Sequence, residues 1–226
     1  MAAIEKVFKS EDFAIGVRET PWTISGTRYR DSFPQNCNYC YAKGYFSADC
    51  VCFVKAYVWG KGVLYNNPGS YWYNPGKYGL GDVTCKQMID GCDDVSTDMS
   101  KIAPGEILYI KGANDLTGHI GVYVGDYTKT INGKTYTYNV TEASPIWRNG
   151  IQATYMDANG NRYQCKGGTQ SGRWEKHGKL KQVDYGSNSA DVPLKYTVKT
   201  EGNKSFISVD GKGTLSVEST VTVKAV

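Results

Sequence analysis

Cys50 is the residue of this chain best placed to do chemistry, because it stands at the start of a segment with helical periodicity. Val51, Val54 and Val58 recur at the spacing of one helix face, so we expect an amphipathic helix that begins near Cys50 and continues toward Trp59. The first turn of a helix presents unpaired N–H groups and the positive end of the dipole, which favour a thiolate over a thiol. The thiolate is the reactive species, so this position predicts a nucleophile.

The residues around Cys50 support this interpretation and also offer an alternative to it. Ser47 or Asp49 can cap the start of the helix with a side-chain oxygen. A free cysteine, however, is more often a small buried hydrophobe. Cys52, which faces elsewhere on the helix, fits that structural role better than Cys50 does.

A nucleophilic thiolate needs a base that takes up its proton and later gives it to a leaving amine, and imidazole suits both steps at neutral pH. The chain has two histidines. His119 opens a strand directly after Gly118, where a glycine lets backbone or substrate come close, whereas His177 lies in a charged segment near the end of the domain. We therefore expect His119 to be the base.

The imidazole also needs an acceptor that orients it, and Glu142 ends the neighbouring strand. Asn132-Gly133 is the dipeptide best suited to a type I′ hairpin turn, so strands over 119–125 and 135–142 should be antiparallel neighbours. Glu142 would then stand near the open end of this hairpin, toward His119.

The ideal register of this hairpin leaves a gap between the two side chains. Pairing across a perfect two-residue turn places Glu142 opposite Tyr123, on the same side of the sheet as His119. The two residues are then about 13 Å apart along the strand, at a rise of about 3.3 Å per residue. A bulge or bend at Gly125-Asp126 is required to close that distance.

The rest of the sequence supplies further elements of a sheet. We expect strands over 106–110, around 151–155 and around 162–165, and a short helix between Thr84 and Gly91. The first 35 residues, by contrast, are expected to form an irregular wrap. Prolines at positions 21 and 34 interrupt any helix there.

The chain is expected to divide into one domain over residues 1–186, a linker over 187–194 and a short β-rich tail over 195–226. The tail alternates like three strands, with turns at Gly202-Asn203 and Asp210-Gly211. About thirty residues are too few to bury an independent core. The tail must therefore pack on the domain, associate with another chain, or be a fragment of a larger module.

The amino-acid composition limits the classes of protein to which this chain can belong. A chain of 226 residues that is 40% apolar can fill the core of one ordinary domain. A net charge of +4, with scattered Lys and Arg, predicts no nucleic-acid partner. Apolar runs are too short to span a bilayer and the start of the sequence has no hydrophobic signal region, so we expect synthesis in the cytoplasm and no stable membrane insertion. The eighteen tyrosines suit an aromatic-lined cleft.

The cysteines do not form a recognisable framework. Their number, seven, is odd in a sequence without a secretion signal, which argues against a complete set of disulfides. Cys37 and Cys40 have zinc-knuckle spacing, and Cys85 and Cys92 could add two thiolates, but the order and spacing make a weak zinc signal. We expect neither a metal nor a cofactor, while the pairing of these four cysteines stays open.

Several blocks of sequence together resemble a known family. They are Asp49-Cys50 at a helix start, Pro104-Gly105-Glu106-Ile107-Leu108, Gly118-His119-Ile120-Gly121-Val122-Tyr123-Val124-Gly125, and Thr141-Glu142-Ala143-Ser144 followed by Trp147-Arg148-Asn149-Gly150-Ile151-Gln152. In this order they resemble the NlpC-type cell-wall cysteine peptidases, in the version found in endolysins of bacteriophages that infect Gram-positive bacteria. The resemblance covers about residues 36 to 185, and the block around His119 is its most specific part.

The resemblance implies a papain-like α+β fold, with the nucleophile helix packed on an antiparallel β-sheet, and hydrolysis of amide bonds in peptidoglycan. It implies Cys50 as nucleophile, His119 as base and acid, and Glu142 in the polar third position. Asp49 and Tyr39, and with them Trp147, would help to bind the stem peptide.

The sequence departs from the family pattern at one place, and two alternative functions stay open. Val51-Cys52 replaces the frequent Ser-Gly after the nucleophile, which affects substrate detail. A catalytically inactive peptidoglycan-binding module, or a cysteine amidase or acyltransferase acting on another substrate, is the alternative function. The enzyme would act at the bacterial cell wall after release during phage lysis, and residues 195–226 would serve wall binding or self-association.

Overall fold

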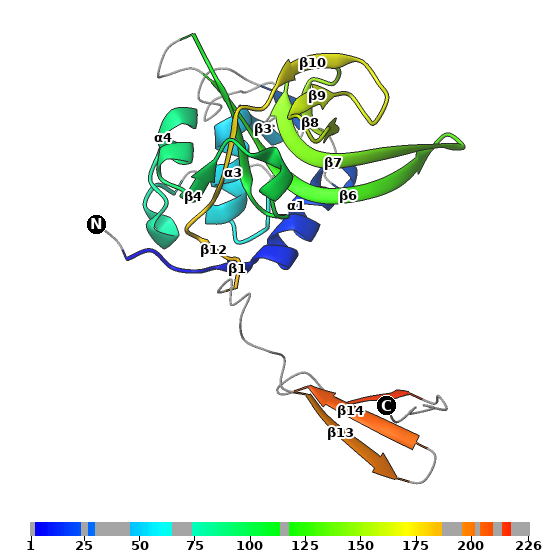
Figure 1. Ribbon diagram of the computed structural model, residues 1–226. Helices are drawn as coiled ribbons and strands as arrows, with labels where there is room; N and C mark the ends of the chain where they lie inside the picture. Colours follow the sequence, from blue (N-terminus) through cyan, green and yellow to red (C-terminus); the bar gives the residue numbers. More distant parts are fainter. Residues whose placement is uncertain are drawn as a thin grey trace. The chain divides into compact units, whose positions relative to one another are not determined.

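The computed structural model describes residues 3–23, 27–29, 46–64, 74–113, 118–186, 196–201, 204–209 and 214–217. The chain divides into two compact units, Met1–Gly186 and Ser187–Val226 (Figure 1). The boundary between them falls where the predicted linker begins.

The first unit combines few helices with many strands. Its helices are α1 (Ser10–Thr23), α3 (Cys50–Trp59) and α4 (Cys85–Asp90), with the 3-10 turns η2 (Lys77–Gly79) and η3 (Met99–Lys101). Its strands are β1 (Phe8–Lys9), β2 (Thr27–Tyr29), β3 (Phe46–Ala48), β4 (Asp93–Ser96), β5 (Ile107–Lys111), β6 (Gly118–Ile131), β7 (Lys134–Ser144), β8 (Gly150–Met156), β9 (Asn161–Tyr163), β10 (Gln170–Arg173), β11 (Lys176–Lys179) and β12 (Val183–Asp184).

The main sheet is antiparallel throughout and runs β10-β9-β8-β7-β6-β5-β11-β4. Two short parallel pairs, β1 with β12 and β2 with β3, lie outside it. The unit is therefore mixed α and β with a mostly antiparallel sheet, which fits the predicted α+β class. No helix of the described residues is both long enough and apolar enough to cross a membrane.

Helix α3 begins at Cys50, as its periodicity and its capping residue predict. The Asp49 side chain accepts a hydrogen bond from the backbone N–H of Cys52 at 2.7 Å. The helix is not amphipathic as expected, because all ten of its residues are buried. Even Lys55 is 2% exposed, with its ammonium group on Asp82 and on the carbonyl of Val83.

The two faces of the sheet pack against different partners. Ile107, Ile120 and Val122 belong to the larger core together with α3, whereas Leu108 and Val140 belong to a smaller cluster with Trp174. Side chains alternate between the faces along each strand. The face opposite the apolar row of β6 therefore carries His119, as the alternation predicts.

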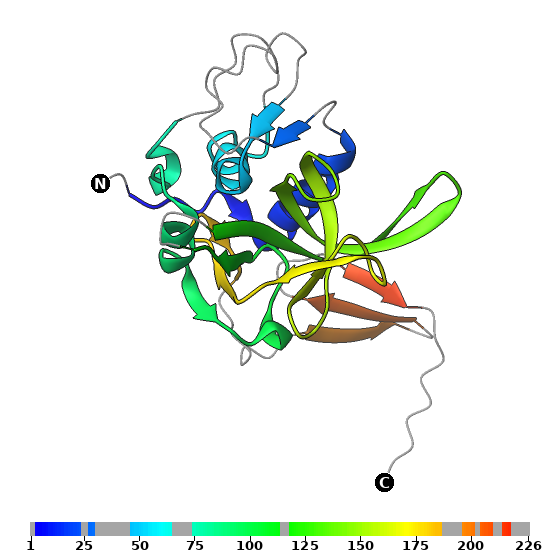
Figure 2. The ribbon, with the colours of Figure 1, turned by 90° about the horizontal axis from the view of Figure 1, so that it is seen from above.

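Strands β6 and β7 form a long hairpin that extends beyond the neighbouring strands in both views (Figures 1 and 2). Asn132 and Gly133 have φ of 51° and 78°, which is the positive-φ pair that a type I′ turn requires. Near the turn the register is the ideal one, with Ile131 opposite Lys134. The predicted hairpin is thus present.

The ideal register does not continue to the far end of the hairpin. Between Tyr123 and Tyr127 β6 advances four residues while β7 advances only two, from Tyr138 to Val140, so β6 contains two additional residues. Gly125, with φ of 75°, lies in this bulge. Glu142 consequently pairs with Gly121 rather than with Tyr123, and the bend required by the sequence is found where it was expected.

The predicted irregular N-terminal wrap is wrong for residues 10–23, which form α1. Phe13, Val17 and Thr20 are buried at helical spacing and fix this helix against the rest of the unit. Pro21 lies in the last turn, so its missing N–H removes a backbone hydrogen bond only near the end of the helix. The proline therefore lies near the end of the helix, which continues to Thr23, and does not prevent it.

The second unit is a three-stranded antiparallel sheet of β13 (Tyr196–Glu201), β14 (Lys204–Val209) and β15 (Thr214–Val217). Tyr196 pairs with Val209, and Ser208 pairs with Thr214. The strands flank the turn positions that the sequence indicates, so the three-stranded prediction for the tail is confirmed.

Candidate active site

Cys50 occupies the first residue of α3 and is 4% exposed. Its sulfur lies 3.5 Å from the sulfur of Cys85, the first residue of α4, and 4.0 Å from the carbonyl oxygen of Gly118. Gly118 directly precedes His119 at the start of β6. The thiol thus lies where two helices begin and where the strand that carries the expected base also begins.

The protonation of Cys50 depends on opposing neighbours. The hydrogen bond with Cys85 and burial raise the pKa of the Cys50 thiol well above its ordinary value, whereas a hydrogen bond with His119 and the charge of that ring lower it. The expected net shift toward the thiolate is therefore not found in this arrangement. His119, rather than the helix end alone, is the group that favours ionisation.

His119 is held on two sides. Its Nε2 bonds to Oε2 of Glu142, and its ring stacks on Trp174 with centroids 5.3 Å apart and planes inclined by 18°. Since Nε2 is bonded to the carboxylate, Nδ1 is the nitrogen left for Cys50. Burial alone would lower the pKa of His119, but the charge of Glu142 and the hydrogen bonds with Cys50 and Glu142 raise it to about 9.

Gly121 makes room for this stack. It lies opposite Glu142 on the paired strand, two residues from His119 on the same face. A Cβ at this position would lie 2.8 Å from the indole ring of Trp174. Only glycine leaves the space through which Trp174 reaches the imidazole.

Glu142 is completely buried and fully bonded. Thr154 donates to its Oε1 at 2.7 Å, and Arg162 donates from Nε to Oε1 at 2.7 Å and from Nη2 to Oε2 at 2.6 Å. Burial alone would raise the pKa of Glu142, but His119 and Arg162 outweigh it and lower the pKa to about 2. The carboxylate is therefore ionised at neutral pH.

Arg162 is the site residue that the sequence did not reveal. It lies on β9, is 3% exposed, and also donates to Oγ of Ser144 at 3.1 Å. Its guanidinium lies 4.7 Å from the ring centroid of Trp147 and 5.9 Å from that of Trp174. The only signal was that the strand around 162 was expected in the same meander as Glu142, and its register depends on connections that the sequence does not define.

The three residues predicted to bind substrate differ in where the structure places them. Asp49 caps α3 through Oδ1 and is partly exposed. Trp147 is half-buried in the connection between β7 and β8 and covers the guanidinium of Arg162, so it adjoins the Glu142 network. Tyr39 lies outside the described residues, as do Cys37 and Cys40.

The second histidine serves a different arrangement. His177 is 3% exposed, with Nδ1 on the carboxylate of Glu106 and Nε2 on the carbonyl oxygen of Asp98 at 3.0 Å. Both ring nitrogens are thus bonded within the core. This agrees with the choice of His119 as the candidate base.

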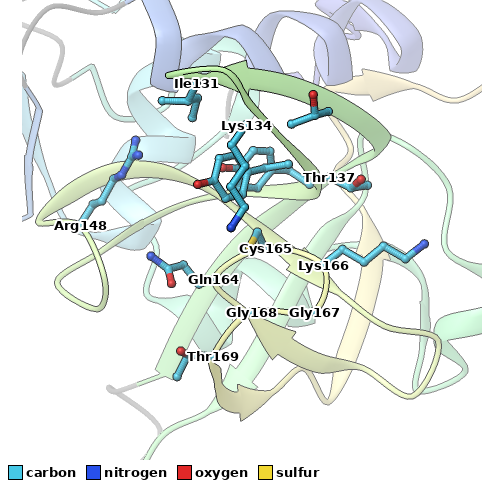
Figure 3. Close-up of a pocket in the computed structure, with 13 residues that line it drawn as sticks. Ile131, Lys134, Thr137, Arg148, Gln164, Cys165, Lys166, Gly167, Gly168 and Thr169 are labelled. Atoms are coloured by element: carbon cyan, nitrogen blue, oxygen red, sulfur yellow. The ribbon is translucent and has the colours of Figure 1, made fainter.

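A surface pocket of about 550 Å³ lies elsewhere, at the hairpin formed by β6 and β7 (Figure 3). It is lined by Ile131, Lys134, Thr135, Tyr136, Thr137, Tyr138, Arg148, Gln164, Cys165, Lys166, Gly167, Gly168 and Thr169. None of Cys50, His119 and Glu142 is among these residues. The pocket is therefore not the candidate catalytic site.

A metal site is not formed by the part of the chain that the structure describes, where no three His, Cys, Asp or Glu side chains are grouped suitably. Of the cysteines considered for zinc, Cys85 contacts Cys50 and Cys92 donates to the carbonyl oxygen of Met88 at 3.3 Å. Cys37 and Cys40, the other two cysteines of this weak zinc signal, lie outside the described residues.

Comparison of the chain with protein-family models, with curated proteins and with solved structures gives no match. Function must therefore be argued from the side chains of the site.

Proposed function

We propose that this chain is a peptidoglycan hydrolase with a papain-like NlpC-type fold, which cleaves an amide bond of the stem peptide through Cys50, His119 and Glu142. The observation that carries the proposal is the arrangement of three groups, in which His119 interacts with the Cys50 thiol and is bonded to the buried carboxylate of Glu142. A nucleophile, a base within reach and a group that orients the base are the parts that acyl transfer needs. The choice of peptidoglycan rests on the sequence resemblance.

In the reactive form of the site, Cys50 and His119 hold one proton between them. The raised pKa of His119 favours the thiolate–imidazolium arrangement, and the contact with Cys85 favours the thiol. The thiolate attacks the carbonyl carbon of the scissile amide. The negative oxygen of the tetrahedral intermediate would be stabilised by backbone N–H groups, including that of Cys50 at the start of α3.

His119 then protonates the leaving amine, and an acyl-enzyme remains on Cys50. Water enters, His119 removes its proton, and the attack of hydroxide on the thioester releases the acid and regenerates the thiol. Glu142 keeps its contact with Nε2 throughout, so that Nδ1 continues to face the sulfur. Asp49 and Trp147 are the described residues that we propose to contact the stem peptide.

The test is digestion of purified cell walls, followed by turbidity and by mass spectrometry of the released fragments. The expected result is loss of turbidity with new amine and carboxyl ends at one amide bond, and Cys50→Ala should reduce the rate at least about a thousandfold. Cys165→Ser is the matched control, because Cys165 is a partly exposed thiol away from these residues. Unchanged release by Cys50→Ala would refute the mechanism.

The outcomes also separate the alternatives. Binding to walls without any released fragment would favour an inactive binding module, and release only from other amides would favour an amidase of different substrate. The enzyme is proposed to act at the cell wall after phage lysis, with the unit Ser187–Val226 serving wall binding or self-association.

A further inference from the structure

Arg162 approaches Glu142 as a fork. Its Nε and Nη2 atoms donate to separate oxygens of the carboxylate, at 2.7 Å and 2.6 Å. Two parallel bonds of this kind fix the rotation of a carboxylate as well as its position, which a single donor does not. Without Arg162, Oε1 would keep only Thr154 and Oε2 would keep only His119, which is the ring that the carboxylate has to orient.

We infer that Arg162 is a positioning residue of the proposed reaction: by holding both oxygens of Glu142, it directs Oε2 at Nε2 of His119 and so turns Nδ1 toward Cys50. The inference rests on the proposed function for its catalytic meaning. The guanidinium is itself held in place by Ser144 and lies near the rings of Trp147 and Trp174. The orientation of the imidazole thus depends on a side chain from β9, two strands away from β7.

The charge of Arg162 has a separate effect from its geometry. Glu142 has no exposed surface, and a buried carboxylate without a cationic partner tends to take up a proton. The groups that face the carboxylate are His119 from β6, Thr154 from β8 and Arg162 from β9, with Cys50 from α3 beyond the imidazole. Removing one positive charge from this set raises the pKa of every remaining titratable group.

The test follows alkylation of Cys50 by iodoacetamide against pH, with peptide mapping to separate Cys50 from the other thiols. Arg162→Met should move the profile to higher pH by about one unit or more. Arg162→Lys keeps the charge but lacks the fork, so its alkylation profile should stay near that of the parent chain while wall hydrolysis falls about tenfold or more. Arg173→Met, at an exposed arginine of β10, is the matched control.

Each outcome decides the inference. An unshifted Arg162→Met profile in a folded protein, judged by circular dichroism, would reduce Arg162 to a structural role. Hydrolysis at the wild-type rate by Arg162→Lys would overturn the inference that Arg162 positions Glu142. If Arg162→Met does not fold, the result with Arg162→Lys alone tests the inference. A shifted profile in a protein that cuts no cell wall would refute the proposed function but leave the control by Arg162 intact.

A second inference comes from the two sulfurs at the site. The Sγ atoms of Cys50 and Cys85 lie 3.5 Å apart, close to contact, and a disulfide requires about 2.05 Å. Both residues are largely buried, at 4% and 6% exposure. The two sulfurs therefore need to approach each other by about 1.5 Å to form a disulfide.

We propose that Cys85 resolves oxidation of Cys50 by hydrogen peroxide. The Cys50 thiolate attacks the O–O bond and becomes a sulfenic acid, with release of hydroxide. The Cys85 sulfur then attacks the sulfenic sulfur, the S–O bond breaks, and water leaves with the thiol proton. The two thiols have together given two electrons to the peroxide, and the disulfide both blocks catalysis and prevents further oxidation of Cys50.

The test is treatment of the folded chain with hydrogen peroxide, followed by disulfide mapping and by reduction with dithiothreitol. We expect a Cys50–Cys85 bridge and full recovery of free Cys50 on reduction, whereas Cys85→Ser should accumulate irreversible sulfinic and sulfonic forms of Cys50. Cys92→Ser, at a buried thiol elsewhere, should behave like the parent chain. A different bridge, or irreversible oxidation of Cys50 in the parent chain, would overturn the proposal, and neither readout depends on wall hydrolysis.

Discussion

The described residues contain two pairs of imidazole and carboxylate, and the pairs differ in what the second nitrogen of the ring contacts. His119 bonds to Glu142 through Nε2, and its other nitrogen remains for Cys50. His177 bonds to Glu106 through Nδ1, and its other nitrogen bonds to the carbonyl oxygen of Asp98 at 3.0 Å. Both carboxylates hold their imidazoles firmly, but only the first leaves a nitrogen that can exchange a proton with a reactant.

The two carboxylates differ as well. Glu142 has a bidentate partner in Arg162, whereas Glu106 forms no ion pair with an arginine or lysine of the described residues. A buried His–Glu contact is therefore not by itself a sign of catalysis. The added cation and the nearby thiol are what distinguish the pair that we propose to be reactive from the pair that is bonded on both sides of its ring.

The largest effect should come from exchanging the two histidines separately for glutamine. His119→Gln removes the base and should lower wall hydrolysis about a thousandfold or more. His177→Gln should keep the activity of the folded protein but cost about 1–3 kcal/mol of unfolding free energy, because Glu106 loses its buried partner. Turbidity assays measure the loss of activity and chemical denaturation measures the loss of stability. Equal losses of activity in the two variants would contradict the different roles assigned to His119 and His177.

Substitution of the two carboxylates should also affect activity at one site and stability at the other, with smaller effects than substitution of the histidines. Glu142→Gln leaves Arg162 buried without its counter-charge and offers His119 an amide, so activity should fall about a hundredfold or more. Glu106→Gln should lower the melting temperature with little change in kcat. Steady-state kinetics on soluble wall fragments, at temperatures where both variants are folded, provide the measurement.

The pH dependence of stability should reveal the His119 pair. The pKa of His119 rises in the folded state from its ordinary 6.5 to about 9, so the folded protein binds this proton more tightly than the unfolded chain does. The stabilisation is complete below about pH 6.5 and is lost as pH increases toward 9. The difference in unfolding free energy between the parent chain and His119→Gln should therefore shrink over this range, and a difference that grows instead would contradict the assignment.

The smallest catalytic effect is expected from deleting residues 187–226, the second compact unit. The deleted chain should hydrolyse soluble wall fragments at the parent rate, because both histidine pairs lie in Met1–Gly186. Binding to intact walls or the oligomeric state should change. If sedimentation with walls and size-exclusion chromatography both remain unchanged, the proposed role of the tail is wrong.

Local chemistry was sufficient to predict several elements. The start of α3 follows from Asp49 as a cap, the β6–β7 turn follows from Asn132-Gly133, and the side of the sheet that carries His119 follows from alternation. Each of these depends on residues that are close in sequence. They could be predicted because no distant contact decides them.

Distant contacts decide what was missed. Arg162 reaches Glu142 only because β8 and β9 add to the sheet in one register, and Cys85 reaches Cys50 only because α4 begins beside α3. Helix α1 was missed for a different reason, since burial of Phe13 and its neighbours outweighs the proline near its end. Periodicity and turn signals do not contain this information.

The bulge in β6 limits how this hairpin can change in length. It adds two residues, and since side chains alternate in direction, an even number leaves Glu142 on the side that carries His119. A single inserted or deleted residue there would reverse the side chains on one side of the bulge relative to those on the other. With residues 127–131 kept in register with β7, the imidazole of His119 would then lie among the apolar residues on the opposite face of the sheet. We therefore expect that insertions or deletions at Gly125-Asp126 are tolerated only in steps of two residues. A library of insertions at this position would test that expectation directly.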